Sequence, residues 1–158
     1  MVVKIIDTIY GGYGIAKYEN GKIIFIPHSV ENDILDITII KENKKFSYAS
    51  INKIIEKSNY RIDPKCKYAG ICGGCVFNHI NYNKQIDIKK NIIINSIRNI
   101  NYKNDDIKII FNSNNKGYRF KTNDFVEVDE CYVMKNSLLQ KIKSFVIENN
   151  LTESIYDI

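Results

Sequence analysis

The sequence predicts an α+β protein in which a five-stranded β-barrel of the OB type precedes a small α/β subdomain built around a cysteine cluster. Two observations lead to this fold class. The first 58 residues consist of short β-branched segments separated by turn signals, and a C-x5-C-x2-C run at residues 66–75 precedes a segment with helical periodicity. At 158 residues the chain can hold two small domains. We expect a barrel over residues 1–58, and the cysteine loop, a helix and an incomplete central domain over residues 59–158.

The barrel rests on five predicted strands. Asn20 and Gly21 tolerate positive φ and suit a tight hairpin turn between the second and third strands, and Pro27 ends the third. Short strands at hairpin spacing favour a barrel, because closure of the sheet removes its exposed edges. The predicted strands span residues 2–9, 15–18, 22–26, 34–41 and 46–55.

The glycine run GGYG at residues 11–14 has two interpretations. A phosphate-binding glycine loop is followed by the N-terminus of a helix, whereas a hairpin follows here, so we reject a nucleotide loop. We expect these glycines to let the strand bend at a barrel corner or to bring the backbone close to a ligand.

The second half begins after a polar connector at residues 58–63. A helix is predicted over residues 81–100 with Asn81 as its N-cap, and a last helix begins at Ser137, where Gln140 completes a capping box. Residues 107–111 and 125–128 have the composition of strands. The expected apolar faces are Ile86, Ile93, Ile97 and Ile100 on the first helix, and Leu138, Ile142 and Phe145 on the last.

The charge and composition of the chain limit the classes of partner and the cellular compartment that we expect. The net charge of +5 fits a polyanionic partner, although a composition rich in lysine, asparagine and isoleucine can also come from an AT-rich genome. The first 25 residues lack a signal-peptide pattern, and no run approaches the length of a membrane span. We expect a cytoplasmic protein without a membrane partner, whose thiols stay reduced.

Three of the four cysteines lie in the run CKYAGICGGCVFNH at residues 66–79. A structural zinc site usually offers two short-spaced pairs of ligands, whereas this chain has Cys66, Cys72 and Cys75 in one loop and Cys131 far downstream. Three thiolates from one loop and a fourth from elsewhere are the pattern of plant-type iron–sulfur ligation. The pattern alone leaves an iron–sulfur cluster, a zinc site and free redox thiols open.

Three segments carry a resemblance to a known family: DTIYGGYGIAKYENGKIIFIP, then YRIDPKCKYAGICGGCVFNHINYNKQIDIKK, then GYRFK. Together they resemble the front end of the S-adenosylmethionine (SAM)-dependent RNA (uracil-5-)-methyltransferases, which act on C5 of uridine in ribosomal and transfer RNA. The matching positions after the cysteine loop are Tyr82, Gln85 and Lys89 on the predicted helix, and Tyr118, Arg119 and Lys121 in the later segment.

The resemblance implies a fold and a cofactor. The barrel would be a TRAM domain, a small OB-like RNA-binding barrel. Iron–sulfur members of the family hold a 4Fe–4S cluster with the cysteine triplet and one distant cysteine, which correspond here to Cys66, Cys72, Cys75 and Cys131.

The resemblance covers residues 1 to about 135, and the part of the family that binds SAM and supplies the nucleophilic cysteine has no counterpart in this sequence. We expect that the chain is not catalytic alone and that SAM binds only to a catalytic domain. In one version of this hypothesis, that domain belongs to a separate methyltransferase chain. The expected RNA is 23S ribosomal RNA or transfer RNA. The alternative is a stand-alone, zinc-stabilised RNA-binding protein.

The residues expected to contact RNA come from the barrel, from two of the three arginines of this lysine-rich chain, and from Lys121. Tyr13 is a candidate for base stacking, and a place in the barrel core is its alternative role. For Arg61 the alternative is a structural ion pair with Asp63. We expect His79 to be a structural residue. The full set of predicted RNA contacts is Lys17, Lys22, Lys44, Tyr13, Arg61, Arg119 and Lys121.

Overall fold

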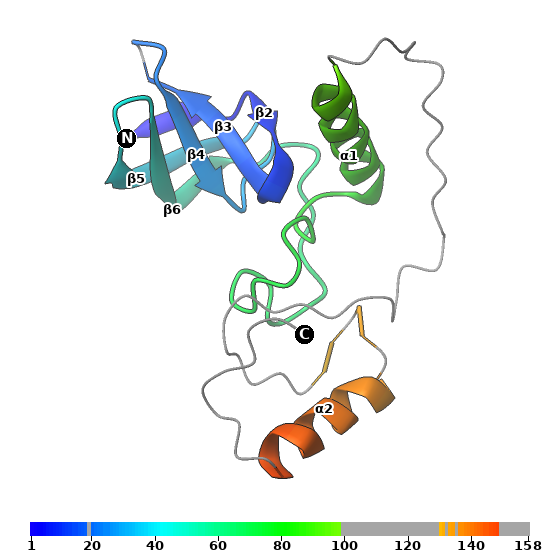
Figure 1. The fold of residues 1–158 in the computed structure, drawn as a ribbon. Helices are drawn as coiled ribbons and strands as arrows, with labels where there is room; N and C mark the ends of the chain where they lie inside the picture. The colour runs from blue at the N-terminus through cyan, green and yellow to red at the C-terminus, as the bar shows by residue number, and fades with distance from the viewer. Residues whose placement is uncertain (19, 99–129, 132, 135, 149–158) are drawn as a thin grey trace. The chain divides into compact units, whose positions relative to one another are not determined.

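The computed structural model describes residues 1–18, 20–98, 130–131, 133–134 and 136–148 (Figure 1). The chain divides into two compact units, which are described separately. The first unit consists of Met1–Asp63 and Val76–Ile109, and the second consists of Pro64–Cys75 and Ile110–Ile158. The predicted division after residue 58 stays a prediction, and the predicted strands at 107–111 and 125–128 lie outside the described residues.

Six strands form one sheet in the first unit (Figure 1). Their order across the sheet is β1-β5-β6-β4-β3-β2, and neighbouring strands are antiparallel except for the parallel pair β4 and β6. The strands are β1 (Val2–Lys4), β2 (Asp7–Thr8), β3 (Tyr13–Lys17), β4 (Ile23–Pro27), β5 (Ile34–Glu42) and β6 (Phe46–Glu56).

The two edge strands of this sheet, β1 and β2, follow each other directly in the chain. The amide of Ile5 donates to the carbonyl of Asp33 next to β5 (2.9 Å), and the amide of Ile6 donates to the carbonyl of Ile15 on β3 (2.8 Å). The predicted strand at residues 2–9 is therefore two short strands that pair with different partners, and the sheet has six strands rather than five. The resulting curl of the sheet favours the predicted OB-like barrel.

The hairpin predicted at Asn20 and Gly21 joins β3 to β4. Gly21 has a φ of +82°, the left-handed region in which a side chain is strained, and the Tyr18 amide donates to the carbonyl of Lys22 (2.9 Å). Because β4 and β6 run parallel with Ile23 opposite Phe46, the turn before β4 lies beside the turn before β6.

The core of the sheet comes from alternating side chains. In β4, Ile24 and Ile26 are fully buried while their neighbours face outward, as the strand period of two requires. Each buried isoleucine stabilises the fold by about 2 kcal/mol relative to an exposed one. The cluster comprises Val3, Ile5, Ala16, Ile24, Ile26, Leu35, Ile37 and Ala49.

Helix α1 (Tyr82–Ile97) belongs to the same unit. The predicted N-cap is confirmed, because the Asn81 side chain accepts a hydrogen bond from the Lys84 amide at 2.9 Å. The predicted apolar face is correct only in part: Ile86 and Ile97 are partly buried, Ile93 is 47% exposed, and Ile100 lies outside the described residues. The fully buried residue of the helix is Ile88, and Ile92 packs beside it. The residues that enclose Ile88 are Val30, Ile80, Tyr60 and Phe77.

Helix α2 (Asn136–Glu148) lies in the second unit and begins next to the predicted Ser137. Leu139 and Met134 are buried there, whereas Leu138 and Phe145, which we expected to be buried, are about half exposed. Within the described part of the chain, no helix combines the length and apolarity that crossing a membrane requires.

Candidate functional site

The two ends of the cysteine loop are joined in the first unit. Arg61 and Ile80 form an isolated antiparallel bridge. Around it, the Ile62 amide donates to the carbonyl of His79 (2.9 Å), and the Asn81 amide donates to the carbonyl of Tyr60 (2.8 Å). These bonds close residues 62–79 into a loop with a fixed base.

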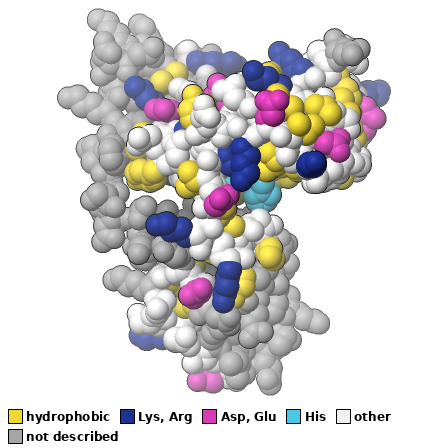
Figure 2. Space-filling view, turned by 180° about the vertical axis from the view of Figure 1, so that it is seen from behind, with side chains coloured by type: hydrophobic (Ala, Val, Ile, Leu, Met, Phe, Trp, Pro, Cys, Tyr) yellow, Lys and Arg dark blue, Asp and Glu magenta, His cyan; other side chains and the backbone are white. Residues whose placement is uncertain are grey.

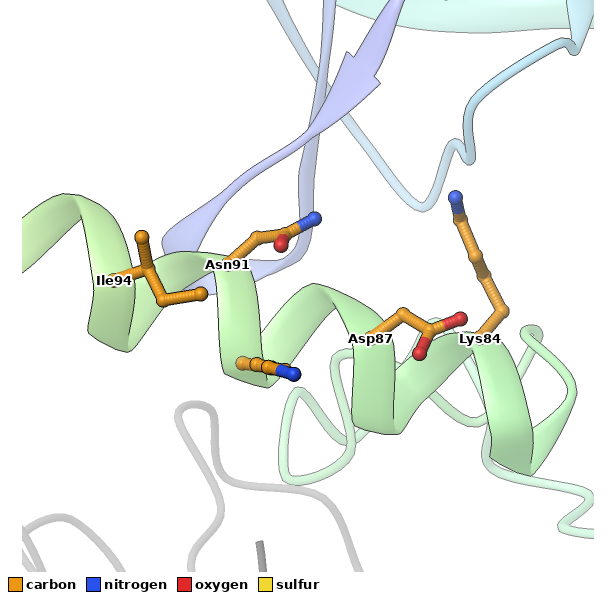
Figure 3. A pocket seen from close by; sticks show the side chains of 5 residues that line it. Lys84, Asp87, Asn91 and Ile94 are labelled. Atoms are coloured by element: carbon orange, nitrogen blue, oxygen red, sulfur yellow. The ribbon is translucent and has the colours of Figure 1, made fainter. Parts of the chain in front are cut away.

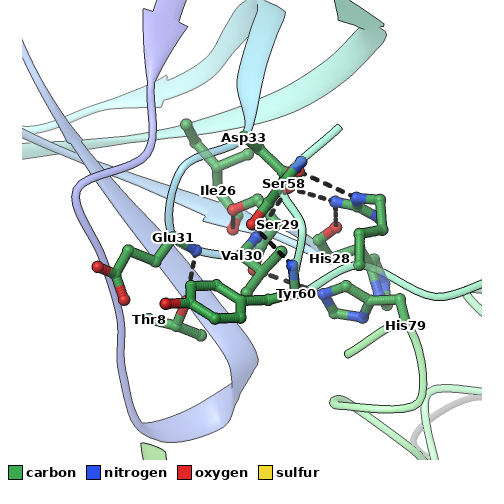
Figure 4. Close-up of polar contacts among 11 residues, drawn as sticks. Thr8, Ile26, His28, Ser29, Val30, Glu31, Asp33, Ser58, Tyr60 and His79 are labelled. Atoms are coloured by element: carbon green, nitrogen blue, oxygen red, sulfur yellow. Dashed lines mark hydrogen bonds and ion pairs between the residues drawn. The ribbon is translucent and has the colours of Figure 1, made fainter. Parts of the chain in front are cut away.

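A buried ion pair supports this base (Figure 4). The Asp33 carboxylate is fully buried and accepts from the Arg61 guanidinium through Nε (3.1 Å) and Nη2 (2.5 Å). It also accepts from the backbone amides of Val30 (2.9 Å) and Ser58 (3.0 Å). The Asp33 carboxylate thus accepts hydrogen bonds both from its own turn and from residues 58–61, and these bonds hold the start of the cysteine loop in place.

Arg61 therefore has a structural partner, and that partner is Asp33. The partner expected from the sequence, Asp63, pairs instead with Lys57 at 3.4 Å on the surface. Arg61 Nη2 also donates to the carbonyl of His28 (2.9 Å), and the Arg61 side chain is only 9% exposed. A contact of Arg61 with RNA stays a prediction.

Two histidines lie against the ion pair (Figure 4). His79 is 4% exposed, its Nε2 lies 3.4 Å from the carbonyl oxygen of Ser29, and its Nδ1 has no hydrogen-bond partner within the described residues. Burial first, and then the nearby Arg61 charge, lower the pKa of His79 to about 4. The same two causes lower the pKa of His28. His79 is thus held neutral near pH 7, as suits the structural role predicted for it.

In the second unit, tight turns fold the loop that carries three cysteines. The Ala69 amide donates to the carbonyl of Cys66 (3.1 Å), and the Cys72 amide donates to the carbonyl of Tyr68 (3.0 Å). Gly73 follows with a φ of +70° and turns the chain before Cys75. The thiols of this loop are partly exposed, and none of the chain's four cysteines, all of them described, forms a disulfide.

An ion pair brings the segment of the fourth cysteine to this loop. Lys67 Nζ lies 3.9 Å from Glu130 Oε1. Lys67 directly follows Cys66 in the chain, and Glu130 directly precedes Cys131. The pair is exposed on both sides, so it contributes little stability. The pair shows instead that the segment of Cys66 and the segment of Cys131 contact each other through the residues next to these cysteines.

The donor chemistry fits a metal cluster, although the ligands are not preassembled. Four thiols that are neither paired as disulfides nor fully buried are the soft ligands that iron–sulfur clusters and zinc require. Among the described residues, no three of the side chains that bind metals lie close enough together to hold a single ion.

The predicted RNA contacts of the barrel gather at one end of the sheet. Lys17 lies opposite Ile23, at the start of β4, and Lys44 lies in the turn before β6. Both side chains are exposed. Lys22 is less available, since its Nζ pairs with Glu42 Oε1 (2.5 Å) and lies 5.8 Å from the centroid of the Tyr18 ring.

Tyr13 lies on the outer face of the sheet, partly exposed, rather than in the core. Its ring contacts those of Phe25 and Tyr48, with centroids 6.3 and 6.0 Å apart. Arg119 and Lys121, the remaining predicted contacts, lie outside the described residues. On the face drawn in Figure 2, lysine and arginine side chains are interspersed with acidic ones and form no continuous basic patch among the described residues.

A polar pocket of about 450 Å³ lies along one side of α1 (Figure 3). Its lining comes from successive turns of the helix and is mostly polar. Lys84, at one end, is already engaged with Glu31 and lies 4.3 Å from the centroid of the Tyr60 ring. The lining residues are Lys84, Asp87, Lys90, Asn91 and Ile94.

Sequence reasoning missed Asp33 and the aromatic residues that neighbour Tyr13. A single Asp in a turn carries no signal of a buried ion pair, because its partner Arg61 lies 28 positions away. The rings could have been found: Phe25 alternates with buried Ile24 and Ile26, which places it on the outer face of a half-buried strand.

Comparison with known proteins identifies relatives, although no protein-family model matches the chain. A protein of Aquifex aeolicus, named an uncharacterized RNA methyltransferase, is 30% identical over 144 residues, which cover 78% of this chain and 33% of that protein. Relatives with the same name occur in Thermotoga maritima (32% identity, 64% of this chain and 23% of the relative) and Staphylococcus epidermidis (26%, 98% and 39%). The chain thus has homologues named RNA methyltransferase along most of its length, and it spans about a quarter to two fifths of theirs.

The fold is also similar to that of a solved structure. It is the crystal structure of the Pyrococcus abyssi tRNA (uracil-54, C5)-methyltransferase in complex with S-adenosyl-L-homocysteine. The TM-score is 0.58 at 19% identity, and the match covers 94% of this chain and 37% of that one. At this identity the likeness concerns the fold.

Proposed function

We propose that this chain is the RNA-binding, 4Fe–4S-containing portion of a SAM-dependent methyltransferase that acts on C5 of uridine in 23S ribosomal RNA or transfer RNA. The observation that carries the proposal is the similarity of almost the whole chain to proteins named RNA methyltransferase. The fold likeness to a tRNA (uracil-54, C5)-methyltransferase supports the choice of uridine C5 within that class.

In this proposal the curled sheet is the TRAM-like RNA-binding barrel. The parallel pairing of β4 with β6 supports it, because this pairing collects lysines from two separate turns at one end of the sheet. Lysines attract the phosphate backbone without reading its sequence. The choice of the target uridine would then belong to other parts of the enzyme.

The cysteine loop is the cluster site of the proposal, with Cys66, Cys72, Cys75 and Cys131 as ligands. Support comes from the donor set and from the Lys67–Glu130 contact between the two segments. The cluster would tie the two segments together and so stabilise the second unit. If these thiols instead bind zinc, the chain is the zinc-stabilised RNA-binding protein that is the alternative function.

Methyl transfer requires SAM, an activated cysteine nucleophile and a general base in one pocket. All four cysteines of this chain are assigned to the cluster, and a thiolate bound to iron is not free to attack a ring carbon. We therefore assign SAM binding and catalysis to a catalytic domain that works with this chain. That domain can also be a separate methyltransferase subunit.

RNA binding by the purified chain tests the first half of the proposal. With about four phosphate contacts to single-stranded RNA, the logarithm of the association constant should fall by about 3 for each tenfold rise in salt. Fluorescence anisotropy of a labelled single-stranded RNA, measured over a salt series, gives this slope. Affinity that does not depend on salt contradicts the lysine contacts, and no binding at low salt contradicts the RNA-binding function itself.

A further inference from the structure

Four aromatic rings form one continuous cluster on the outer face of the sheet. Phe25 on β4 contacts Phe46 and Tyr48 on β6, with centroids 5.6 Å apart in both pairs, and Tyr13 on β3 extends the cluster from the other side. Each ring is partly exposed. We call this set, consisting of Tyr13, Phe25, Phe46 and Tyr48, the aromatic platform.

The aromatic platform does not belong to the core. Ile24 and Ile26, which flank Phe25 along β4, are fully buried on the opposite face, as are Ser47 and Ala49 on β6. Aromatic residues that merely fill a core lie on that inner face. Rings gathered outward, at a cost in exposed apolar area, indicate a surface that binds a partner.

Lysines border the aromatic platform at one end. Lys41 on β5 lies opposite Tyr48, Lys44 and Lys45 directly precede Phe46, and Lys17 lies in the same cross-strand row as Phe46. All four side chains are exposed. Of the acids nearby, Glu42 is paired with Lys22. Asp7 lies opposite Ile15 on the far strand β2.

We propose that the aromatic platform stacks unpaired bases of RNA while the bordering lysines hold its phosphates. Rings and cations in one strip match a single strand, whose bases are free to stack and whose backbone is anionic. Tyr13 lies four residues along β3 from Lys17, about 13 Å, so the strip can run along several nucleotides. This inference rests on the proposed RNA-binding function and specifies how it is achieved.

The direct test compares two ligands on the unchanged protein. One is a labelled oligouridine of about twelve nucleotides, and the other has the same backbone without bases. We expect the abasic strand to bind roughly tenfold or more weakly, with the same salt slope, because stacking is lost while the phosphates remain. Equal affinity for the two strands overturns the proposal.

Variants locate the effect on the protein. Phe46→Leu and Tyr48→Leu keep an apolar side chain and remove the ring, and each should weaken binding to oligouridine several-fold while barely affecting the abasic strand. Ile55→Ala, at the other end of the same strand, should leave both affinities unchanged. If the ring variants, shown to be folded by circular dichroism, bind oligouridine as the parent does, the aromatic platform is not the stacking site.

A second pair of variants separates the phosphate contacts from the stacking contacts. Lys44→Gln should reduce the salt slope by about 0.7, whereas Lys53→Gln, an exposed lysine on the other half of β6, should not change it. A parent chain that binds neither strand refutes the proposed function as a whole. A parent chain that binds both strands equally, with a steep salt slope, keeps that function and refutes the aromatic platform alone.

Discussion

At the scale of single residues, the base of the cysteine loop depends on one buried carboxylate. Asp33 is fully buried, and its partner Arg61 is also the residue that bridges to Ile80. A buried charge without its partner keeps its desolvation cost and loses its compensation. The geometry of the loop's ends therefore follows from an interaction between residues far apart in the sequence.

Asp33→Asn should destabilise the first unit by about 3 kcal/mol, because it leaves the Arg61 charge buried without a counter-charge. Asp63→Asn is the matched control: it removes a carboxylate from the exposed pair with Lys57 and should cost less than about 1 kcal/mol. Urea unfolding of both variants measures the difference. Equal midpoints would show that the buried pair contributes no more than the surface pair.

The pKa of His79 predicts a dependence of stability on pH. The ordinary pKa of 6.5 applies in the unfolded chain, and burial and Arg61 lower it to about 4 in the folded protein. Between these values the unfolded chain binds a proton that the folded protein does not, so stability falls as the pH falls below about 6.5. From pH 7 to pH 5 the contribution of His79 to this loss is about 2 kcal/mol.

His79→Asn removes this titration and should flatten the stability curve between pH 7 and pH 5. Acids such as Asp36, whose pKa is lowered by its hydrogen bond to the N-terminal ammonium, titrate in both proteins and cancel in the comparison. Two parallel curves would mean that His79 has the same pKa in the folded protein as in the unfolded chain.

At the scale of elements, the sequence located the strands and helices better than their partners. The β-branched segments and the turn at Gly21 placed β3 and β4 to within two residues. The predicted first strand proved to be two, because Ile5 bonds to Asp33 next to β5 and Ile6 bonds to Ile15 on β3, and such long-range pairing leaves no local signal.

The prediction of the buried helix faces was inaccurate for a related reason. Helix α1 has isoleucine on several sides, so periodicity could not decide which side is buried. The Asn81 cap and the docking of Ile88 against Val30 and Ile80 decide it. At the candidate site, the sequence supplied the four thiols and the lysines, and its alternation could have placed Phe25 on the outer face. The Asp33–Arg61 pair and the assembly of four rings into one platform required the tertiary structure.

The turn between β2 and β3 yields a prediction at this scale. A Cβ on Gly12 would lie 2.7 Å from Val76 Cβ and 2.8 Å from the Val76 carbonyl oxygen, at the end of the cysteine loop. Gly12→Ala should therefore destabilise the protein by more than the roughly 1 kcal/mol that positive φ alone costs. Gly21→Ala, with a similar φ and open space around it, isolates that backbone cost.

Thermal unfolding of the two glycine variants gives the comparison. We expect the melting temperature of Gly12→Ala to lie below that of Gly21→Ala. The reverse order would show that the turn does not press against the end of the cysteine loop.

At the scale of the whole molecule, the two units have different tasks in the proposed function. The first has its own core of apolar strands, whereas the second contains a short cysteine loop and α2, on which Phe145 is half exposed. Small units are often stabilised by a metal or by disulfides, and the four cysteines of this unit, all of them described, form no disulfide. In the proposed function a bound cluster would add to the stability of this unit.

The central claim is that Cys66, Cys72, Cys75 and Cys131 hold one 4Fe–4S cluster, and the metal content of the anaerobically purified chain tests it most directly. The parent and His79→Asn should each contain about four irons and about four acid-labile sulfides per chain, whereas Cys131→Ser should lose both together. Stoichiometric zinc without iron or sulfide, after expression with ample iron, would contradict the claim.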